Sequence, residues 1–155
     1  MIIRKAKLTD IDRLSELLYV VHNLHAEGRP DIFTKGKQKY TKEDLVAVLS
    51  NDKTPVWVAE EKKEVIGYLF AVYEEIKDHQ SLVSRKTLYI DDICVDEKYR
   101  GMKAGTQLYN YAKMIARTNG CYDITLNVWN LNPGAMKFYE KMGLKPLKVT
   151  MEEIL

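Results

Sequence analysis

The order in which the hydrophobic pattern changes along the chain constrains its fold most. Apolar residues recur at three- and four-residue spacing over 11–25 and 41–49, which predicts two helices near the start. Two β-rich runs follow at 56–60 and 65–73, and the charged turn 61–64 between them predicts an antiparallel hairpin. From there the pattern alternates between strand and helix. This order predicts a mixed α/β fold.

The alternating part of the chain is punctuated by residues that begin and end helices. Its predicted elements are a strand over 87–95, a helix over 104–118, a strand over 122–129, a helix over 133–142 and a last strand over 144–150. Pro133 stands near the start of the short helix and Gly143 follows its end, as is common for both residue types. No repeat or linker interrupts the 155 residues, so we expect a single domain over 1–155.

Composition and charge exclude several classes of protein. The chain holds 24 Lys and Arg against 22 Asp and Glu, and a net charge of +2 favours neither nucleic acid nor a membrane surface. A content of 46% hydrophobic and 30% charged residues is typical of a globular protein and not of a disordered one. Residues 1–7 lack the apolar core of a signal peptide. We therefore expect a cytoplasmic protein.

The two cysteines, Cys94 and Cys121, both fall in β-like stretches. Neither has a histidine nearby at a spacing typical of metal ligands. We interpret them as two buried thiols and expect no metal, with a disulfide or a metal site as the alternatives.

The segment from Tyr89 to Leu108 carries the clearest chemical signal. A predicted strand leads into a loop with Arg100, Gly101 and Gly105, and a helix begins at the end of that loop. Free backbone N–H groups at a helix N-terminus bind anions, so a phosphate or pyrophosphate ligand is one interpretation. A turn that simply requires glycine is the other. The loop has neither the Gly-Lys-Ser/Thr of a P-loop nor the three glycines of a dinucleotide-binding loop.

Two motifs together resemble those of a known family. Arg-Gly-Met-Lys-Ala-Gly at 100–105 resembles the acyl-CoA pyrophosphate loop of the GCN5-related N-acetyltransferases (GNAT), Gln/Arg-x-x-Gly-x-Gly/Ala. The segment 132–144 is similar to the Asn-x-x-Ala-x-x-Phe-Tyr-Glu-Lys-x-Gly-Phe segment of the same family. The resemblance implies a mixed, mostly antiparallel sheet with a central splayed pair of parallel strands, flanked by helices. It also implies acetyl-CoA as cosubstrate, without a metal.

The resemblance implies that acetyl-CoA lies between the strands 87–95 and 122–129. The residues that it assigns to the cosubstrate are Ile93, Cys94, Val95, Arg100, Gly101, Met102, Lys103, Ala104, Gly105, Thr106 and Asn132. Lys103 departs from the pattern, which has glycine there. A Cβ atom is costly if φ is positive at this residue, although an ammonium beside phosphate is favourable. Asn132 has a second interpretation, as the cap of the helix that begins at Pro133.

Asp91 and Asp92 are candidates for acid–base chemistry. Adjacent strand residues point to opposite faces, so we expect at least one of the two carboxylates in apolar surroundings, where its pKa rises as a general base requires. The Ile-Asp-Asp at 90–92 resembles the Leu-Glu-Asp of spermidine/spermine acetyltransferases, and this resemblance assigns Asp91 the role of base, directly or through a water molecule. The alternative is a pair of solvated acids at a strand end.

Tyr139 is the second catalytic candidate. A phenol with an ordinary pKa of ~10 stays protonated at neutral pH and can donate its proton to a departing thiolate. The resemblance assigns Tyr139 this role because it stands in the Phe-Tyr of the second motif. Packing beside Phe138 is the alternative.

The region between the first two helices lines the acceptor pocket in proteins of the GNAT family. The candidates for contact with a cationic acceptor are Glu27, Asp31, Tyr40 and Asp92, and solvated loop residues are the alternative. We interpret the cluster of Lys35, Lys37, Lys39 and Lys42 as solvated surface. For His22 and His25, packing or substrate contact is a better interpretation than a metal site.

The combined prediction is an acetyl-CoA-dependent N-acetyltransferase that acts on a primary amine, with a small-molecule amine preferred. A protein N-terminus or lysine is an alternative acceptor. Lys103 motivates a second hypothesis, a weakly active or inactive acyl-CoA-binding module. A third is a protein for another phosphate ligand that shares only the strand–loop–helix turn. The resemblance also leaves a homodimer open.

Overall fold

A computed structural model describes residues 1–155 and contains one five-stranded sheet in the order β1-β2-β3-β4-β5. The strands are β1 (Ile2–Lys5), β2 (Val56–Glu61), β3 (Glu64–Ile76), β4 (Arg85–Val95) and β5 (Asp123–Leu126). The helices are α1 (Ile11–Gly28), α2 (Lys42–Leu49), α3 (Ala104–Thr118) and α4 (Pro133–Lys141), with short 3₁₀ turns at Leu8–Asp10 and Glu97–Tyr99. Neighbouring strands are antiparallel except β4 and β5, which are parallel. The predicted mixed α/β fold is confirmed, but the parallel pair lies at one edge of the sheet and not at its centre as expected.

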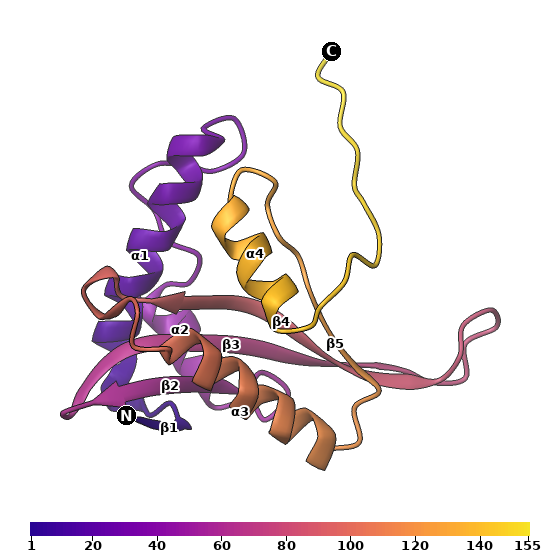
Figure 1. Cartoon of the computed structure of the whole chain (residues 1–155), viewed down its shortest axis with the longest axis horizontal. Coiled ribbons are helices and arrows are strands. Elements are labelled where there is room, and N and C mark those ends of the chain that lie inside the picture. Colours follow the sequence, from indigo (N-terminus) through magenta and orange to yellow (C-terminus); the bar gives the residue numbers. More distant parts are fainter.

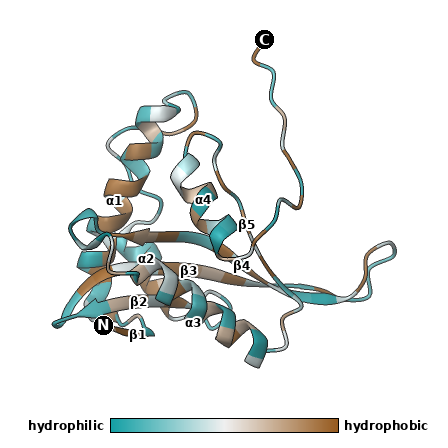
Figure 2. Cartoon of the chain, in the orientation of Figure 1, coloured by the Kyte–Doolittle hydropathy of each residue, from teal (hydrophilic) through white to brown (hydrophobic).

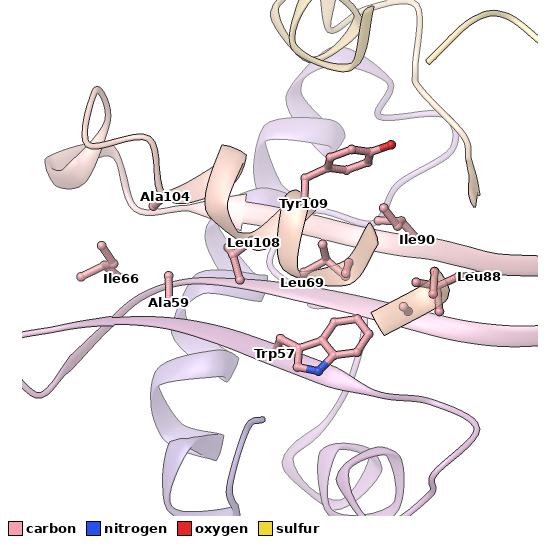
Figure 3. Packing of buried hydrophobic residues seen from close by; sticks show 12 residues of the cluster. Trp57, Ala59, Ile66, Leu69, Leu88, Ile90, Ala104, Leu108 and Tyr109 are labelled. Atoms are coloured by element: carbon pink, nitrogen blue, oxygen red, sulfur yellow. The ribbon is translucent and has the colours of Figure 1, made fainter. Parts of the chain in front are cut away.

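The sheet separates two hydrophobic layers. On one face α3 packs through Leu108 and Tyr109 onto strand residues such as Trp57 and Leu69 (Figure 3). On the other face α1 and α2 cover Tyr68 and the residues around it. Figure 1 shows α3 in front of the sheet and α1 behind it. The loops at the end of β4 and before α3 therefore connect elements that are anchored in these two layers.

Helix boundaries follow local sequence signals closely. The helix predicted over 104–118 is α3 itself. At α2 the Thr41 hydroxyl accepts from the Asp44 N–H at 3.1 Å, and the Asp44 carboxylate accepts from the Thr41 N–H at 2.9 Å. This reciprocal capping satisfies amides that have no partner inside the helix.

The strand predicted over 144–150 does not form. Residues 145–155 have no regular structure and are exposed, with Leu147, Val149 and Met151 72%, 75% and 85% exposed. Figure 1 shows this C-terminal segment leaving the body of the molecule, and Figure 2 shows hydrophobic and hydrophilic residues alternating along it. The strand predicted over 122–129 is also shorter, since only Asp123–Leu126 pairs with β4. An alternation of hydrophobic and hydrophilic residues forms a strand only where the backbone N–H and C=O groups can hydrogen-bond to a neighbouring strand.

No helix in the structure combines the length and apolar content needed to cross a lipid bilayer.

Candidate active site

The parallel strands β4 and β5 part from one another within the sheet. They pair only from Thr87–Ile90 on β4 to Asp123–Leu126 on β5, whereas β4 continues to Val95. Residues 92–95 therefore pair with β3 on one side and with no strand on the other. The open side presents backbone N–H and C=O groups to which an extended ligand with amide groups can bind. Figure 1 shows the two strands diverging at this point.

The start of α3 forms a turn at the end of β4 whose geometry suits an anion. Gly101 and Lys103 both have positive φ, of 87° and 61°. The N–H of Gln107 donates to the Lys103 carbonyl at 3.0 Å, so the amides of residues 103–106 precede the helical hydrogen bonds and have no acceptor in the helix. Unpaired amides and the helix dipole together favour a phosphate here.

Lys103 adopts the left-handed conformation that the family pattern fills with glycine. Its φ and ψ are 61° and 21°. A residue with a Cβ atom pays about 1–2 kcal/mol for this conformation. Arg100 lies at the exposed rim of the turn, where its guanidinium pairs with Glu97 at 2.9 Å. The loop keeps its free amides and adds two cationic side chains.

Helix α4 reaches the same place from another direction. An added Cβ on Gly105 would lie 3.5 Å from the Phe138 ring and 3.7 Å from the Val95 side chain, so β4, α3 and α4 meet there. The Asn132 Oδ1 accepts from the Ala135 N–H at 3.1 Å and caps α4. Its Nδ2 makes no hydrogen bond within the chain, which leaves its two N–H donors for a ligand.

A β-bulge places Asp91 and Asp92 on the same face of the sheet. Phe70 pairs with Asp92 and Ala71 pairs with Ile90, so Asp91 is an extra residue in β4. The expectation that the two acids point to opposite faces is therefore wrong, because the bulge breaks the alternation between them. Both carboxylates hydrogen-bond to tyrosines that belong to the core on the α1 and α2 side.

Both carboxylate oxygens of Asp91 are engaged by residues that precede α2. The Tyr40 hydroxyl donates to Oδ2 at 2.8 Å, and Lys39 Nζ donates to Oδ1 at 2.7 Å. The Tyr40 ring stacks on Phe70 at 5.6 Å between ring centroids, which fixes its position. The structure thus brings together two predicted site residues, Asp91 and Tyr40. Lys39 is exposed, as expected of solvated surface, and the structure adds an ion pair with Asp91 that the sequence did not predict.

Asp92 is the carboxylate in apolar surroundings. Its Oδ2 accepts from the Tyr68 hydroxyl at 2.8 Å. Burial raises the pKa of Asp92, and the hydrogen bond from Tyr68 opposes this only in part. The expectation that one acid of the pair has a raised pKa is confirmed at this residue.

Tyr139 lies half-buried on α4, with its ring 5.2 Å from that of Phe138 between centroids. Burial raises the pKa of Tyr139, and the negative charge of Asp92 raises it further. The phenol is therefore protonated at neutral pH and has a proton to donate. Burial also raises the pKa of the Cys94 thiol, to about 12, so this cysteine is a poor nucleophile.

Two predicted acceptor contacts do not join this group. Asp31 accepts from Arg29 through both carboxylate oxygens, at 2.8 and 2.7 Å. Glu27 is exposed and forms no hydrogen bond or ion pair. Sequence reasoning also missed Tyr68 and Lys39. Tyr68 contacts Asp92 from the neighbouring strand β3, and Lys39 contacts Asp91 from the loop before α2. No spacing along the chain signals either contact.

An aromatic cluster joins α1 to the segment before α4. Phe33 contacts His25, His22 and Trp129, at 5.2, 5.8 and 5.1 Å between ring centroids. Burial lowers the pKa of His25, which favours its neutral form. Both histidines pack against Phe33, in agreement with the interpretation of packing or substrate contact, and substrate contact stays a prediction. The structure contains no group of three or more His, Cys, Asp or Glu residues that could hold a metal ion.

Comparison with known proteins places these features in a family. A probable glucosamine 6-phosphate N-acetyltransferase of Drosophila melanogaster is 26% identical over 144 residues, which cover 92% of this chain and 60% of that protein. N-acetyltransferase 8F1 of Rattus norvegicus is 30% identical over 66% of this chain and 44% of its own length. The chain thus spans about half the length of these two relatives. An uncharacterized N-acetyltransferase of Bacillus subtilis is 29% identical over 92% of this chain and 89% of its own.

Solved structures show the same arrangement. A tetramutant of the BH1408 protein from Bacillus halodurans superimposes with a TM-score of 0.95, at 29% identity over 100% of both chains. An acetyltransferase from Vibrio fischeri gives a TM-score of 0.69 at 25% identity, over 84% of this chain and 98% of its own. The model of the acetyltransferase (GNAT) family matches residues 18–144. The chain therefore belongs to the acetyltransferase (GNAT) family.

Proposed function

We propose that this chain transfers an acetyl group from acetyl-CoA to the primary amine of a small cationic acceptor, by direct attack in a ternary complex. The observation that carries the proposal is the Asp91–Asp92 pair, held where β4 parts from β5, with the charge of Asp92 acting on Tyr139. Carboxylates attract an ammonium group and accept its proton, and a protonated phenol supplies a proton to a thiolate.

The open backbone and the anion-binding turn fit the cosubstrate. The amides of residues 103–106, with Arg100 and Lys103, would hold its diphosphate. The unpaired side of β4 at Ile93–Val95 would bind the amide groups of its pantetheine arm. Asn132 would add the free donor of its side-chain amide. The bound cosubstrate supplies an activated acetyl thioester.

In this mechanism an acidic residue removes a proton from the acceptor, and a tyrosine supplies a proton to the leaving group. Asp91 takes the proton from the acceptor ammonium, directly or through water, and the free amine then attacks the thioester carbonyl. A backbone N–H of Ile93 or Cys94 stabilises the oxyanion. Tyr139 protonates the sulfur as the C–S bond breaks. Asp92, which is more deeply buried, adds negative charge that attracts a cationic acceptor.

The test is release of free CoA thiol from acetyl-CoA in the presence of a panel of amines. The panel contains a polyamine, an amino sugar, an amino acid and a peptide with a free N-terminus. We expect turnover with a small cation and little with the peptide. Turnover with the peptide alone would favour a protein acceptor, and binding of acetyl-CoA without turnover on any amine would favour a binding module.

We also propose that the chain forms a homodimer. β5 has an unpaired outer edge, and the 145–155 segment exposes apolar side chains: Leu147, Val149, Met151, Ile154 and Leu155. A second copy could cover both features. The molar mass of the full chain from light scattering should be that of a dimer, and that of a chain ending at Lys145 should be that of a monomer. A full-length monomer would contradict this assembly.

A further inference from the structure

The ammonium group of Lys39 already occupies the place that the proposed mechanism gives to the acceptor amine. Lys39 Nζ lies 2.7 Å from Asp91 Oδ1, with the lysine side chain 41% exposed and the aspartate side chain 15% exposed. Lys35 and Lys37, on the same segment between α1 and α2, form no ion pair. Lys39 is thus singled out from its neighbours by its contact with the proposed base.

We propose that Lys39 is an internal acceptor, acetylated by the acetyl-CoA bound to its own chain. The proposal rests on the proposed function. Asp91 is the first residue of β4 beyond the last pair with β5, so Lys39 Nζ lies at the mouth of the opening between the strands. The α3 turn that would hold the diphosphate lies on the opposite face of the sheet from Tyr40 and Phe70. An acetyl group that enters the opening from the face covered by α3 would therefore reach Lys39 on the opposite face of the sheet.

The segment that carries Lys39 is fixed at the site. The adjacent Tyr40 donates to the second oxygen of Asp91 at 2.8 Å and stacks on Phe70. Lys39 Nζ also lies 5.7 Å from the centre of the Tyr40 ring. A nucleophile held in this way reacts faster than the same group free in solution, because its approach is already oriented.

The chemical step follows the proposed mechanism and balances without a further reagent. Asp91 takes a proton from the Lys39 ammonium, and the neutral amine attacks the thioester carbonyl. A C–N bond forms, the C–S bond breaks, and Tyr139 protonates the departing sulfur. The nitrogen is positively charged after the attack and loses its second proton to solvent as the amide forms. Tyr139 regains a proton from solvent and Asp91 loses one to it. The products are acetyl-lysine, free CoA and one proton released.

Acetylation would also change the site for external acceptors. An acetylated lysine carries no charge and cannot form an ion pair. Asp91 would then keep its hydrogen bond to Tyr40 and lose its cationic partner, which leaves the carboxylate open to an external ammonium group. Modification of Lys39 would therefore prepare the site for a cationic substrate.

The experiment incubates the full chain with acetyl-CoA and no added amine, and maps acetylation by peptide mass spectrometry over time. Lys35 and Lys37 report the background reaction of exposed lysines on the same segment. We expect Lys39 to be acetylated roughly tenfold faster than either, at a rate independent of protein concentration, because the reaction is intramolecular. Lys37→Arg should leave the Lys39 rate unchanged, whereas Asp91→Asn should reduce it to the background rate.

The outcomes separate this inference from the proposed function. Equal acetylation of Lys39, Lys35 and Lys37, in a chain that acetyl-CoA stabilises against heat, would overturn the inference and leave the proposed function standing. A Lys39 rate that rises with protein concentration would also overturn it. A chain that acetyl-CoA neither stabilises nor acetylates would overturn both. Lys39→Arg keeps the positive charge at Asp91, and it should abolish this acetylation in a folded protein.

Discussion

Lys103 combines a strained backbone with a favourable charge, and substitution can separate the two. Its φ of 61° lies in the left-handed region, whereas glycine adopts such values without a steric penalty. We expect Lys103→Gly to stabilise the fold by about 1 kcal/mol, which corresponds to a rise of roughly 2–4 °C in the midpoint of thermal unfolding. Lys103→Ala, which keeps the strain and removes the charge, is the matched control. A lower midpoint for the glycine variant would contradict this account.

The ionised carboxylate of Asp92 lowers the stability of the fold, because it is buried. The pKa of its carboxyl is raised by burial, so its ionised form destabilises the fold above that pKa and the penalty disappears as the pH falls. Asp92→Asn keeps an oxygen that can accept from Tyr68 and removes the charge. We expect this variant to unfold at a higher temperature than the wild type at pH ~7, and the difference to shrink as the pH is lowered through the acid range. A difference that grows on acidification would contradict the assignment.

Tyr139 tests the proton transfer to the leaving group. Tyr139→Phe removes the hydroxyl and keeps the ring that packs beside Phe138. We expect kcat to fall by about 10²–10⁴-fold, as is typical for loss of a general acid, with an unchanged Kd for acetyl-CoA. Steady-state release of CoA and calorimetric titration measure the two quantities. Unchanged turnover would remove Tyr139 from the mechanism.

Among the elements, α3 has a double role in this account, because it carries the proposed anion-binding turn and covers one face of the sheet. Leu108 is fully buried in that layer (Figure 3). Leu108→Ala should lower the free energy of unfolding by about 2–5 kcal/mol, through lost apolar burial and the cavity left behind. Urea denaturation measures the loss, and the exposed Asn110→Ala on the same helix is the control. A loss as small as that of Asn110→Ala would mean that α3 is not anchored as described.

The elements also show what the sequence can and cannot predict. The bounds of α3 were predictable, because a helix depends on signals within its own segment. The bulge at Asp91 was not, because it exists only in the register between β3 and β4. A pattern with a period of two therefore placed the two acids on opposite faces, although the structure places them together.

At the scale of the whole molecule, the proposed catalytic group is assembled from segments far apart in the chain. The contact between Lys39 and Asp91 joins residues 52 positions apart, and that between Tyr68 and Asp92 joins residues 24 apart. Motifs predicted Asp91, Tyr139 and the loop that ends in α3, but not their partners. The strand predicted over 144–150 was wrong for a related reason, since no segment of the chain lies beside it to complete its hydrogen bonds.

The central claim is that acetyl-CoA binds where β4, α3 and α4 meet, and thermal unfolding tests it most directly. A ligand at ~100 times its Kd adds ~2.7 kcal/mol to the stability of the folded chain. The midpoint should therefore rise by roughly 5–10 °C with acetyl-CoA, and should not rise with ATP or NAD at the same concentration. Equal shifts with all three ligands would indicate a general phosphate site. No shift with saturating acetyl-CoA would contradict the account.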